Sequence, residues 1–129
     1  MVIFDTNMIL RYILNDNEEM AGQAEAYIMV GNVLVTPEVV AEVVYVLKGA
    51  YALDRATIAD TLVNFLELVE CNESEVLRLA LAAYATHNLD FVDCILYAYH
   101  QARGAEIATF DKKLLRLLRA TGNNQTGTA

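Results

Sequence analysis

The chain begins with the stretch Val2-Ile3-Phe4-Asp5-Thr6-Asn7, in which an apolar run is followed directly by turn and helix-capping residues. Such a run predicts a brief buried strand that leads into a helix, because Asp, Thr and Asn side chains accept the first free N–H groups of a helix. Short apolar runs recur at residues 33–35, 68–71 and 107–108, and they predict three further strands.

Helical patterns fill the intervals between these runs. The residues near 39–46 are rich in valine and would favour a strand by propensity alone. However, Thr36-Pro37-Glu38 is typical of a helix start, and the stretch continues unbroken to Lys48, which is too long for an ordinary strand. We therefore predict a helix there. The other expected helices follow Asp5, Asn17, Asp54 (to Leu66), Asn72 (a capping box with Glu75, to about His87), Asp90 (to Arg103, ended by Gly104) and Asp111.

Short apolar strands that alternate with amphipathic helices predict an α/β fold. We expect a three-layer sandwich, with a short central parallel sheet of about four strands and helices on both faces. In such sheets, ligands gather beyond the carboxyl ends of the strands. Asp5 and Asp111 both come one to three residues after a predicted strand, so we expect both at that edge.

Length and composition limit the class of protein. The 129 residues are 56% hydrophobic and carry a formal net charge of −8, which indicates one globular domain and argues against nucleic-acid binding through a basic face. No apolar run approaches the roughly 20 residues that span a bilayer, and no signal peptide is evident, so we expect a cytoplasmic protein. From Thr121 onward the chain is polar, and we predict a disordered tail over 120–129.

Four carboxylates stand out from the acids that cap helices or cover polar faces: Asp5, Glu42, Asp93 and Asp111. Asp5 is not needed as a cap, since Thr6 and Asn7 are available. Glu42 lies in the most apolar helix, where we expect it to be half-buried. Apolar residues surround Asp93, whereas capping alone explains Asp90.

The predicted fold can bring all four acids to one end of the sheet. Carboxylates that are close repel one another unless a cation neutralises them. Oxygen ligands suit Mg²⁺ or Mn²⁺ better than zinc. Such ions can clamp a phosphodiester and activate an attacking water, so these residues point to a metal-dependent phosphodiesterase.

The same segments, in order and spacing, resemble the PIN domain. The resemblance covers residues 1–119 and rests on Phe4-Asp5-Thr6-Asn7 with the following Ile9-Leu10-Arg11-Tyr12, on Glu42 in its valine-rich helix, on Asp90-Phe91-Val92-Asp93-Cys94-Ile95-Leu96, and on Thr109-Phe110-Asp111. Chain size and the first motif are most similar to the VapC-type toxins of toxin–antitoxin pairs.

The resemblance implies a Mg²⁺- or Mn²⁺-dependent endoribonuclease. By the matching motifs, Asp5, Glu42, Asp93 and Asp111 would be the catalytic and metal-binding residues. Groups that support them or contact the substrate would be Thr6, Asn7, Thr109 and Arg11. The partners implied are an RNA substrate, a cognate antitoxin protein and a second copy in a homodimer, without a membrane.

Two other functions stay open at this stage. One is a catalytically weak PIN-like binding module, whose acidic groove docks a basic segment of a partner. The other is a small phosphatase with Asp5 as its nucleophile, although the second Asp and the downstream Lys expected for that chemistry are absent.

Overall fold

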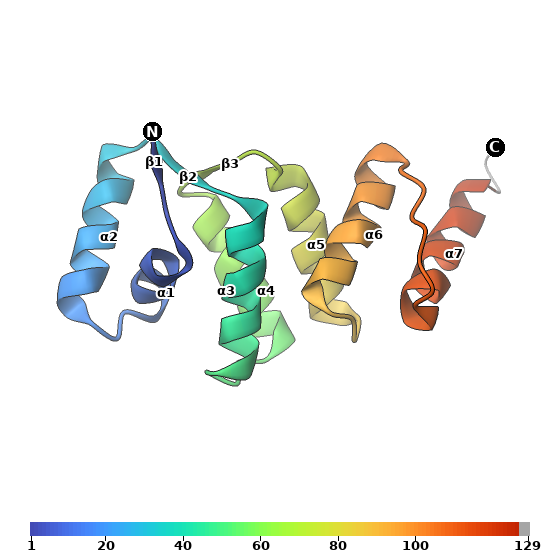
Figure 1. The fold of residues 1–129 in the computed structure, drawn as a ribbon, viewed down its shortest axis with the longest axis horizontal. Coiled ribbons are helices and arrows are strands. Elements are labelled where there is room, and N and C mark those ends of the chain that lie inside the picture. The colour runs from blue at the N-terminus through green and yellow to red at the C-terminus, as the bar shows by residue number, and fades with distance from the viewer. Residues whose placement is uncertain (127–129) are drawn as a thin grey trace.

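The computed structural model describes residues 1–126. Over this range the chain forms seven helices and one three-stranded parallel sheet (Figure 1). The elements, in chain order, are β1 (Val2–Ile3), α1 (Thr6–Leu14), α2 (Glu18–Val30), β2 (Val33–Val35), α3 (Pro37–Gly49), α4 (Arg55–Leu66), β3 (Glu70–Cys71), α5 (Ser74–Thr86), α6 (Phe91–Arg103) and α7 (Lys112–Thr126).

The predicted α/β sandwich is confirmed, with a short parallel sheet in the order β1-β2-β3. The register aligns Ile3 with Leu34 and Val35 with Cys71. Helices α1 and α2 lie at one end of the molecule, α3 and α4 lie near its middle, and α5, α6 and α7 follow toward the other end (Figure 1). The N-terminus therefore lies over the sheet, far from α7.

Local capping explains most of the helix starts. Asn17 and Asp54 accept hydrogen bonds from the backbone N–H groups of Met20 and Thr57, at 3.0 and 2.7 Å, as the sequence predicts. Thr36 caps α3 with Pro37 in the first turn, which confirms a helix in the valine-rich stretch. Gly104 ends α6 in the left-handed region at φ 64°, where a side chain would be strained.

The predicted cap at Asn72 is wrong. Asn72 was expected to begin the fifth helix, but α5 begins at Ser74, and Glu73 occupies the N-cap position without a side-chain capping bond. The carboxylate of Glu73 binds Arg103 of α6 at 2.9 Å instead. A tertiary ion pair has therefore replaced the local cap.

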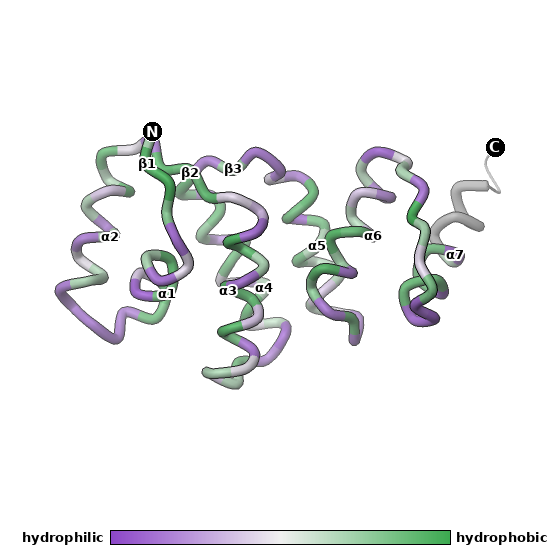
Figure 2. The backbone as a smooth tube through the Cα atoms, in the orientation of Figure 1, coloured by the Kyte–Doolittle hydropathy of each residue, from purple (hydrophilic) through white to green (hydrophobic). Residues whose placement is uncertain are grey.

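The hydrophobic core is continuous from the sheet to α6. It includes Phe4 of the first stretch, Val40, Val43 and Leu47 of α3, and Leu81 of α5, all nearly inaccessible to solvent. Hydrophobic residues recur along successive helices, as the green segments of the backbone show (Figure 2). Leu114 and Leu118 of α7 are also buried, but they lie outside this main cluster. Leu117, which is half-buried, packs against the main cluster and links the described part of α7 to it.

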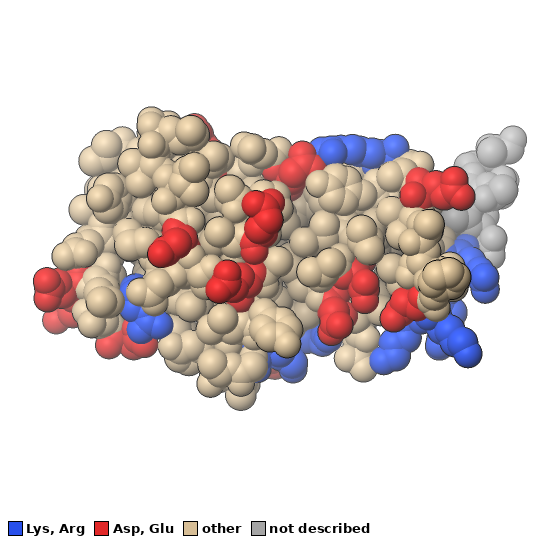
Figure 3. All heavy atoms as spheres, viewed as in Figure 1, with Lys and Arg blue, Asp and Glu red and all other residues tan. Residues whose placement is uncertain are grey.

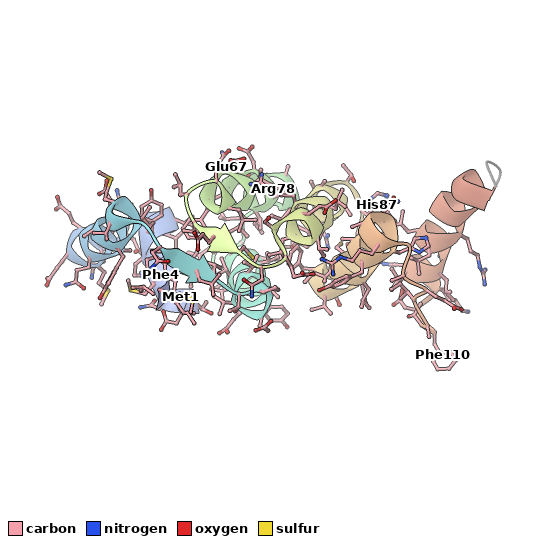
Figure 4. All side chains as sticks on the ribbon, turned by 90° about the horizontal axis from the view of Figure 1, so that it is seen from above. Met1, Phe4, Glu67, Arg78, His87 and Phe110 are labelled. Carbon is pink, nitrogen blue, oxygen red and sulfur yellow. The ribbon has the colours of Figure 1, made fainter. Side chains whose placement is uncertain are left out.

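The fourth predicted strand, residues 107–108, is wrong for the described part of the chain, since the sheet has three strands there. The segment between α6 and α7 is extended but irregular. It lies on the far side of α5 and α6 from β1 (Figures 1 and 4). A strand needs a neighbour about 4.8 Å away, and within the described residues no sheet edge lies beside the segment.

Helix α7 runs to Thr126, so it includes part of the predicted tail. Residues 127–129 of that tail lie outside the described residues. The boundary between a domain of residues 1–119 and a disordered tail of 120–129 stays a prediction.

Candidate functional site

Asp5 lies at the carboxyl end of β1, as predicted, but it also caps α1. Its Oδ1 atom accepts a hydrogen bond from the backbone N–H of Met8 at 2.9 Å, and the side chain is exposed. The expectation that Thr6 and Asn7 would take over the capping role is therefore wrong, because both lie inside the first turn of α1. The capping bond occupies one carboxylate oxygen, and further acceptor capacity remains for another ligand.

Glu42 is exposed, so the expectation of a half-buried carboxylate is wrong. Helix α3 buries one stripe, formed by Val40, Val43, Val44 and Leu47. Glu42 lies outside that stripe, one turn after Glu38, which is also exposed. The two glutamates therefore extend an acidic surface along the outer side of α3.

Asp93 is partly buried and faces other carboxylates. It lines a shallow hollow together with Asp90 and Asp111, beside Lys112 and Lys113. Burial raises the pKa of Asp93 above the usual aspartate value, and repulsion by the charges of Asp111 and Asp90 raises it further. The structure thus brings two of the four predicted site residues, Asp93 and Asp111, into one electrostatically coupled group.

Asp90 also lines this hollow, although the sequence analysis explained it by capping alone. It occupies the N-cap position of α6, yet its side chain makes no capping hydrogen bond. Capping therefore does not explain this carboxylate, contrary to expectation. The available signal was the spacing of Asp90 and Asp93, since residues three apart lie on the same side of a helix.

Asp111 combines a capping role with its place in the hollow. Its Oδ1 accepts a hydrogen bond from the backbone N–H of Leu114 at 2.8 Å, at the start of α7. The backbone N–H of Asp111 donates to Oγ1 of Thr109 at 3.0 Å. Thr109 therefore orients the turn that carries Asp111.

Arg55 holds the loop that carries this hollow, and sequence reasoning missed it. Its Nη1 atom donates to the carbonyl oxygens of Tyr84, His87 and Leu89 at 3.1, 2.7 and 2.8 Å. Its guanidinium also lies 4.2 Å from the ring centroid of Tyr84. One side chain thus ties the end of α5 to the turn before Asp90, which positions the start of α6.

Arg11 does not lie ready for a substrate. Its Nη1 atom binds both carboxylate oxygens of Asp16 at 2.6 Å, and its Nη2 atom donates to the hydroxyl of Tyr51 at 3.0 Å. The basic residues that line the hollow are instead Lys112 and Lys113 of α7, and the same helix also carries Arg116 and Arg119. Figure 3 shows basic side chains gathered over this end of the molecule.

The four predicted acids do not form a single cluster, since Asp93 and Asp111 line one hollow and neither Asp5 nor Glu42 lines it. In Figure 3, acidic side chains are spread over the end of β1, over α3 and over the start of α6. Within the described residues, no group of three or more His, Cys, Asp or Glu side chains is arranged to hold a metal ion. The oxygen donors suit Mg²⁺ by chemistry, but one chain as described does not complete a metal site.

The family model of the PIN domain matches residues 2–119, and the chain therefore belongs to the PIN domain family. PIN domains form a superfamily of nucleases that generally depend on divalent metals. No curated protein and no solved structure matches the chain.

Among the described residues, every helix is too short or too polar to cross a membrane.

Proposed function

We propose that this PIN domain is an endoribonuclease that requires Mg²⁺ or Mn²⁺. The observation that supports it best is the hollow in which Asp90, Asp93 and Asp111 lie beside Lys112 and Lys113. Carboxylates in such a group favour a bound cation, and adjacent lysines attract a phosphate. Asp5 and Glu42 complete the proposed set of catalytic and metal-binding acids.

The proposed roles divide between the residues of this chain. Asp93 and Asp111 hold the cation, and Asp90 adds negative charge beside them. Lys112 and Lys113 bind the phosphate groups on either side of the bond to be cut. When bound, the cation would neutralise charge on the phosphate and favour attack by water. Arg11 is left out of the substrate contacts because Asp16 and Tyr51 already hold its guanidinium.

Cleavage of labelled oligonucleotides tests this function. We expect the wild type to cut a single-stranded RNA with Mg²⁺ or Mn²⁺ and not with EDTA, and to leave the matching DNA intact. Asp93→Asn should lower the rate at least about 100-fold, the scale on which positioned charges act in catalysis. Asp60→Asn is the matched control, because Asp60 is an exposed aspartate of α4 away from the hollow. Equal rates for both variants would contradict the proposal.

Metal binding has its own measurement, which needs no substrate. A ligand at about 100 times its dissociation constant adds roughly 2.7 kcal/mol to the stability of the folded state. We expect Mn²⁺ to raise the melting temperature of the wild type and of Asp60→Asn, but not of Asp93→Asn. If the wild type shows neither cleavage nor a response to Mn²⁺, while a basic peptide binds the acidic face, the protein is instead a binding module.

We further propose that the nuclease is the toxin of a VapC-type toxin–antitoxin pair in the cytoplasm. The resemblance of the first motif supports this role, and the acidic face suits a basic antitoxin segment. Induced expression in bacteria should stop growth for the wild type and for Asp60→Asn, whereas Asp93→Asn should grow normally. Unimpaired growth with the wild type would contradict a toxin role.

A further inference from the structure

A second hollow adjoins the acidic one, between α3 and the start of α6. It has a volume of about 450 Å³, which is within the usual range for small-molecule sites. Its lining includes Tyr45 and Lys48 of α3 and Phe91 and Val92 of α6, and we call it the α3–α6 hollow. Asp90 lines both hollows. A ligand that extends beyond the acidic hollow on this side therefore enters the α3–α6 hollow.

The buried side of the α3–α6 hollow is held rigidly. Tyr84 and Phe91 are both buried, and their rings pack edge to face with centroids 5.7 Å apart. The guanidinium of Arg55 lies 4.2 Å from the ring centroid of Tyr84, and its hydrogen bonds to three carbonyl oxygens keep it there. A hollow built in this way keeps its shape before a ligand binds, so binding costs little reorganisation.

The open side of the α3–α6 hollow has exposed apolar side chains. Tyr45 is 81% exposed and Val92 is 59% exposed. None of the ring contacts between described residues involves Tyr45. An aromatic ring at the mouth of a hollow offers a flat surface on which a base of a single-stranded nucleic acid can stack.

The outer side of α3 connects Tyr45 to charged groups. Glu42, Tyr45 and Lys48 are all exposed and follow one another at intervals of three residues, so they lie on the same side of the helix. Glu42 is one of the proposed catalytic acids. Lys48 is a cation, and no salt bridge between described residues involves it. This side of α3 therefore presents an acid, an aromatic ring and a cation in that order.

The occupant of the α3–α6 hollow must combine a flat apolar surface with negative charge. A free phosphate would leave Tyr45 and Val92 without a contact, and an apolar protein segment would leave the charge of Lys48 without a partner. An unpaired nucleotide has both groups, because its base is flat and weakly polar and its phosphate is anionic.

We propose that the α3–α6 hollow binds one unpaired base of the RNA strand that the acidic hollow cuts. The base stacks on Tyr45, and a phosphate next to it binds Lys48. This inference rests on the proposed function and deepens it, because a base in a duplex is already stacked and paired, and extruding it costs free energy. The site thus selects single strands and loops as substrates.

Binding without metal tests the stacking directly. In EDTA, fluorescence anisotropy measures the affinity for labelled single-stranded oligomers of A, C or U without cleavage. For the oligomer that binds best, Tyr45→Ala should lower the affinity about 10-fold, whereas Tyr45→Phe should stay within about 2-fold of the wild type. Tyr27→Ala is the matched control, because Tyr27 is an exposed tyrosine of α2 that lines a different hollow. A wild type that binds none of the oligomers, or equal affinities for Tyr45→Ala and the wild type, would overturn the proposal.

An abasic nucleotide shows whether Tyr45 contacts a base. Moved along the best-bound oligomer, it should lower the affinity of the wild type about 10-fold at one position. Tyr45→Ala should lose nothing further at that position, because the two changes remove the same contact. Additive losses would place the base elsewhere and overturn the proposal.

The dependence of binding on salt tests Lys48 separately. Each phosphate contact with a single strand contributes about 0.7 to the slope of log affinity against log salt concentration. Lys48→Met should lower that slope by about this amount, whereas Tyr45→Ala should leave it unchanged. Arg78→Met is the control, because Arg78 already pairs with Glu67. An unchanged slope for Lys48→Met would overturn the phosphate contact.

Cleavage kinetics and oligomeric state separate this inference from the other possibilities. With metal, Tyr45→Ala should raise KM about 10-fold and change kcat little, since stacking holds the substrate equally before and during the reaction. Cleavage with an unchanged KM would overturn the base site and leave the proposed nuclease standing. Base binding in EDTA without cleavage in metal would do the reverse. A change of oligomeric state in Tyr45→Ala, seen by light scattering with RNA affinity unchanged, would assign the hollow to a protein partner and overturn the proposal.

Discussion

The body of the molecule, from β1 to α6, and the arm that follows Gly104 are held by different amounts of buried apolar surface. The body shares one core, which runs from Phe4 to Ala98. The arm has two buried side chains among residues 105–120, Leu114 and Leu118, and neither belongs to that core, against which the half-buried Leu117 packs. Segments of the body are thus positioned by many neighbours at once, whereas the position of the arm depends on a few contacts. This difference shows that a segment with a strand-like sequence forms a strand only where packing places another strand beside it.

The largest effect is expected from a cavity in the body. Leu81 is fully buried in α5, and Leu81→Ala should lower the free energy of unfolding by about 3 kcal/mol, measured by urea denaturation. Leu118→Ala in the arm should cost clearly less, because Leu118 lies outside the main cluster. Leu79→Ala on α5 is the surface control, since Leu79 is 37% exposed. Equal losses of unfolding free energy for Leu81→Ala and Leu118→Ala would contradict the distinction between body and arm.

The next effect concerns the junction that carries Asp90 and Asp93. Arg55→Met removes three hydrogen bonds to the carbonyl groups of the α5–α6 turn, and we expect a loss of about 2 kcal/mol in urea denaturation. Arg78→Met is the matched control. It breaks a surface ion pair with Glu67, whose two members face each other in Figure 4, and should cost less than about 1 kcal/mol. A smaller loss for Arg55→Met than for Arg78→Met would contradict the role of Arg55.

The smallest expected effect is electrostatic, and here the substitution should stabilise the folded protein instead of destabilising it. Because burial and neighbouring charges raise the pKa of Asp93, its ionised form weakens the folded state at neutral pH. Asp93→Asn should therefore raise the melting temperature slightly at pH 7 without metal. This gain should shrink as the pH falls through the raised pKa and disappear below the usual aspartate value of about 3.9, where Asp93 is protonated in both states. Asp60→Asn should show no such dependence, and a lower melting temperature for Asp93→Asn at pH 7 would contradict the repulsion.

Local patterns predicted most of the body because its helix starts rest on neighbours in the sequence. Asn17, Thr36 and Asp54 cap their helices where expected. The predicted cap at Asn72 failed because Glu73 pairs with Arg103, thirty residues away in the sequence. No pattern within a few residues carries that information.

The candidate site was less predictable for the same reason. The sequence pointed to Asp93 and Asp111, and the structure brings them together. The sequence predicted the wrong burial for Glu42, since helical periodicity places a residue near an apolar stripe without showing where the packed surface ends. Asp90 was dismissed because its position suits a cap, yet its side chain forms no capping bond. The position of a residue in the sequence suggests a local role such as capping, whereas its neighbours in the folded structure decide which role the side chain takes.

By itself, the sequence determined the α/β class, the order of the first three strands and of the helices, and the acidic motifs of a PIN domain, because periodicity and capping act over a few residues. Only the tertiary structure decided which acids meet, how Arg55 holds the turn before Asp90, and that residues 107–108 lie without a strand partner in their own chain. These outcomes depend on contacts between segments far apart in sequence. Such contacts form only when the core has placed the elements, and the main core of this protein does not include the segment between α6 and α7.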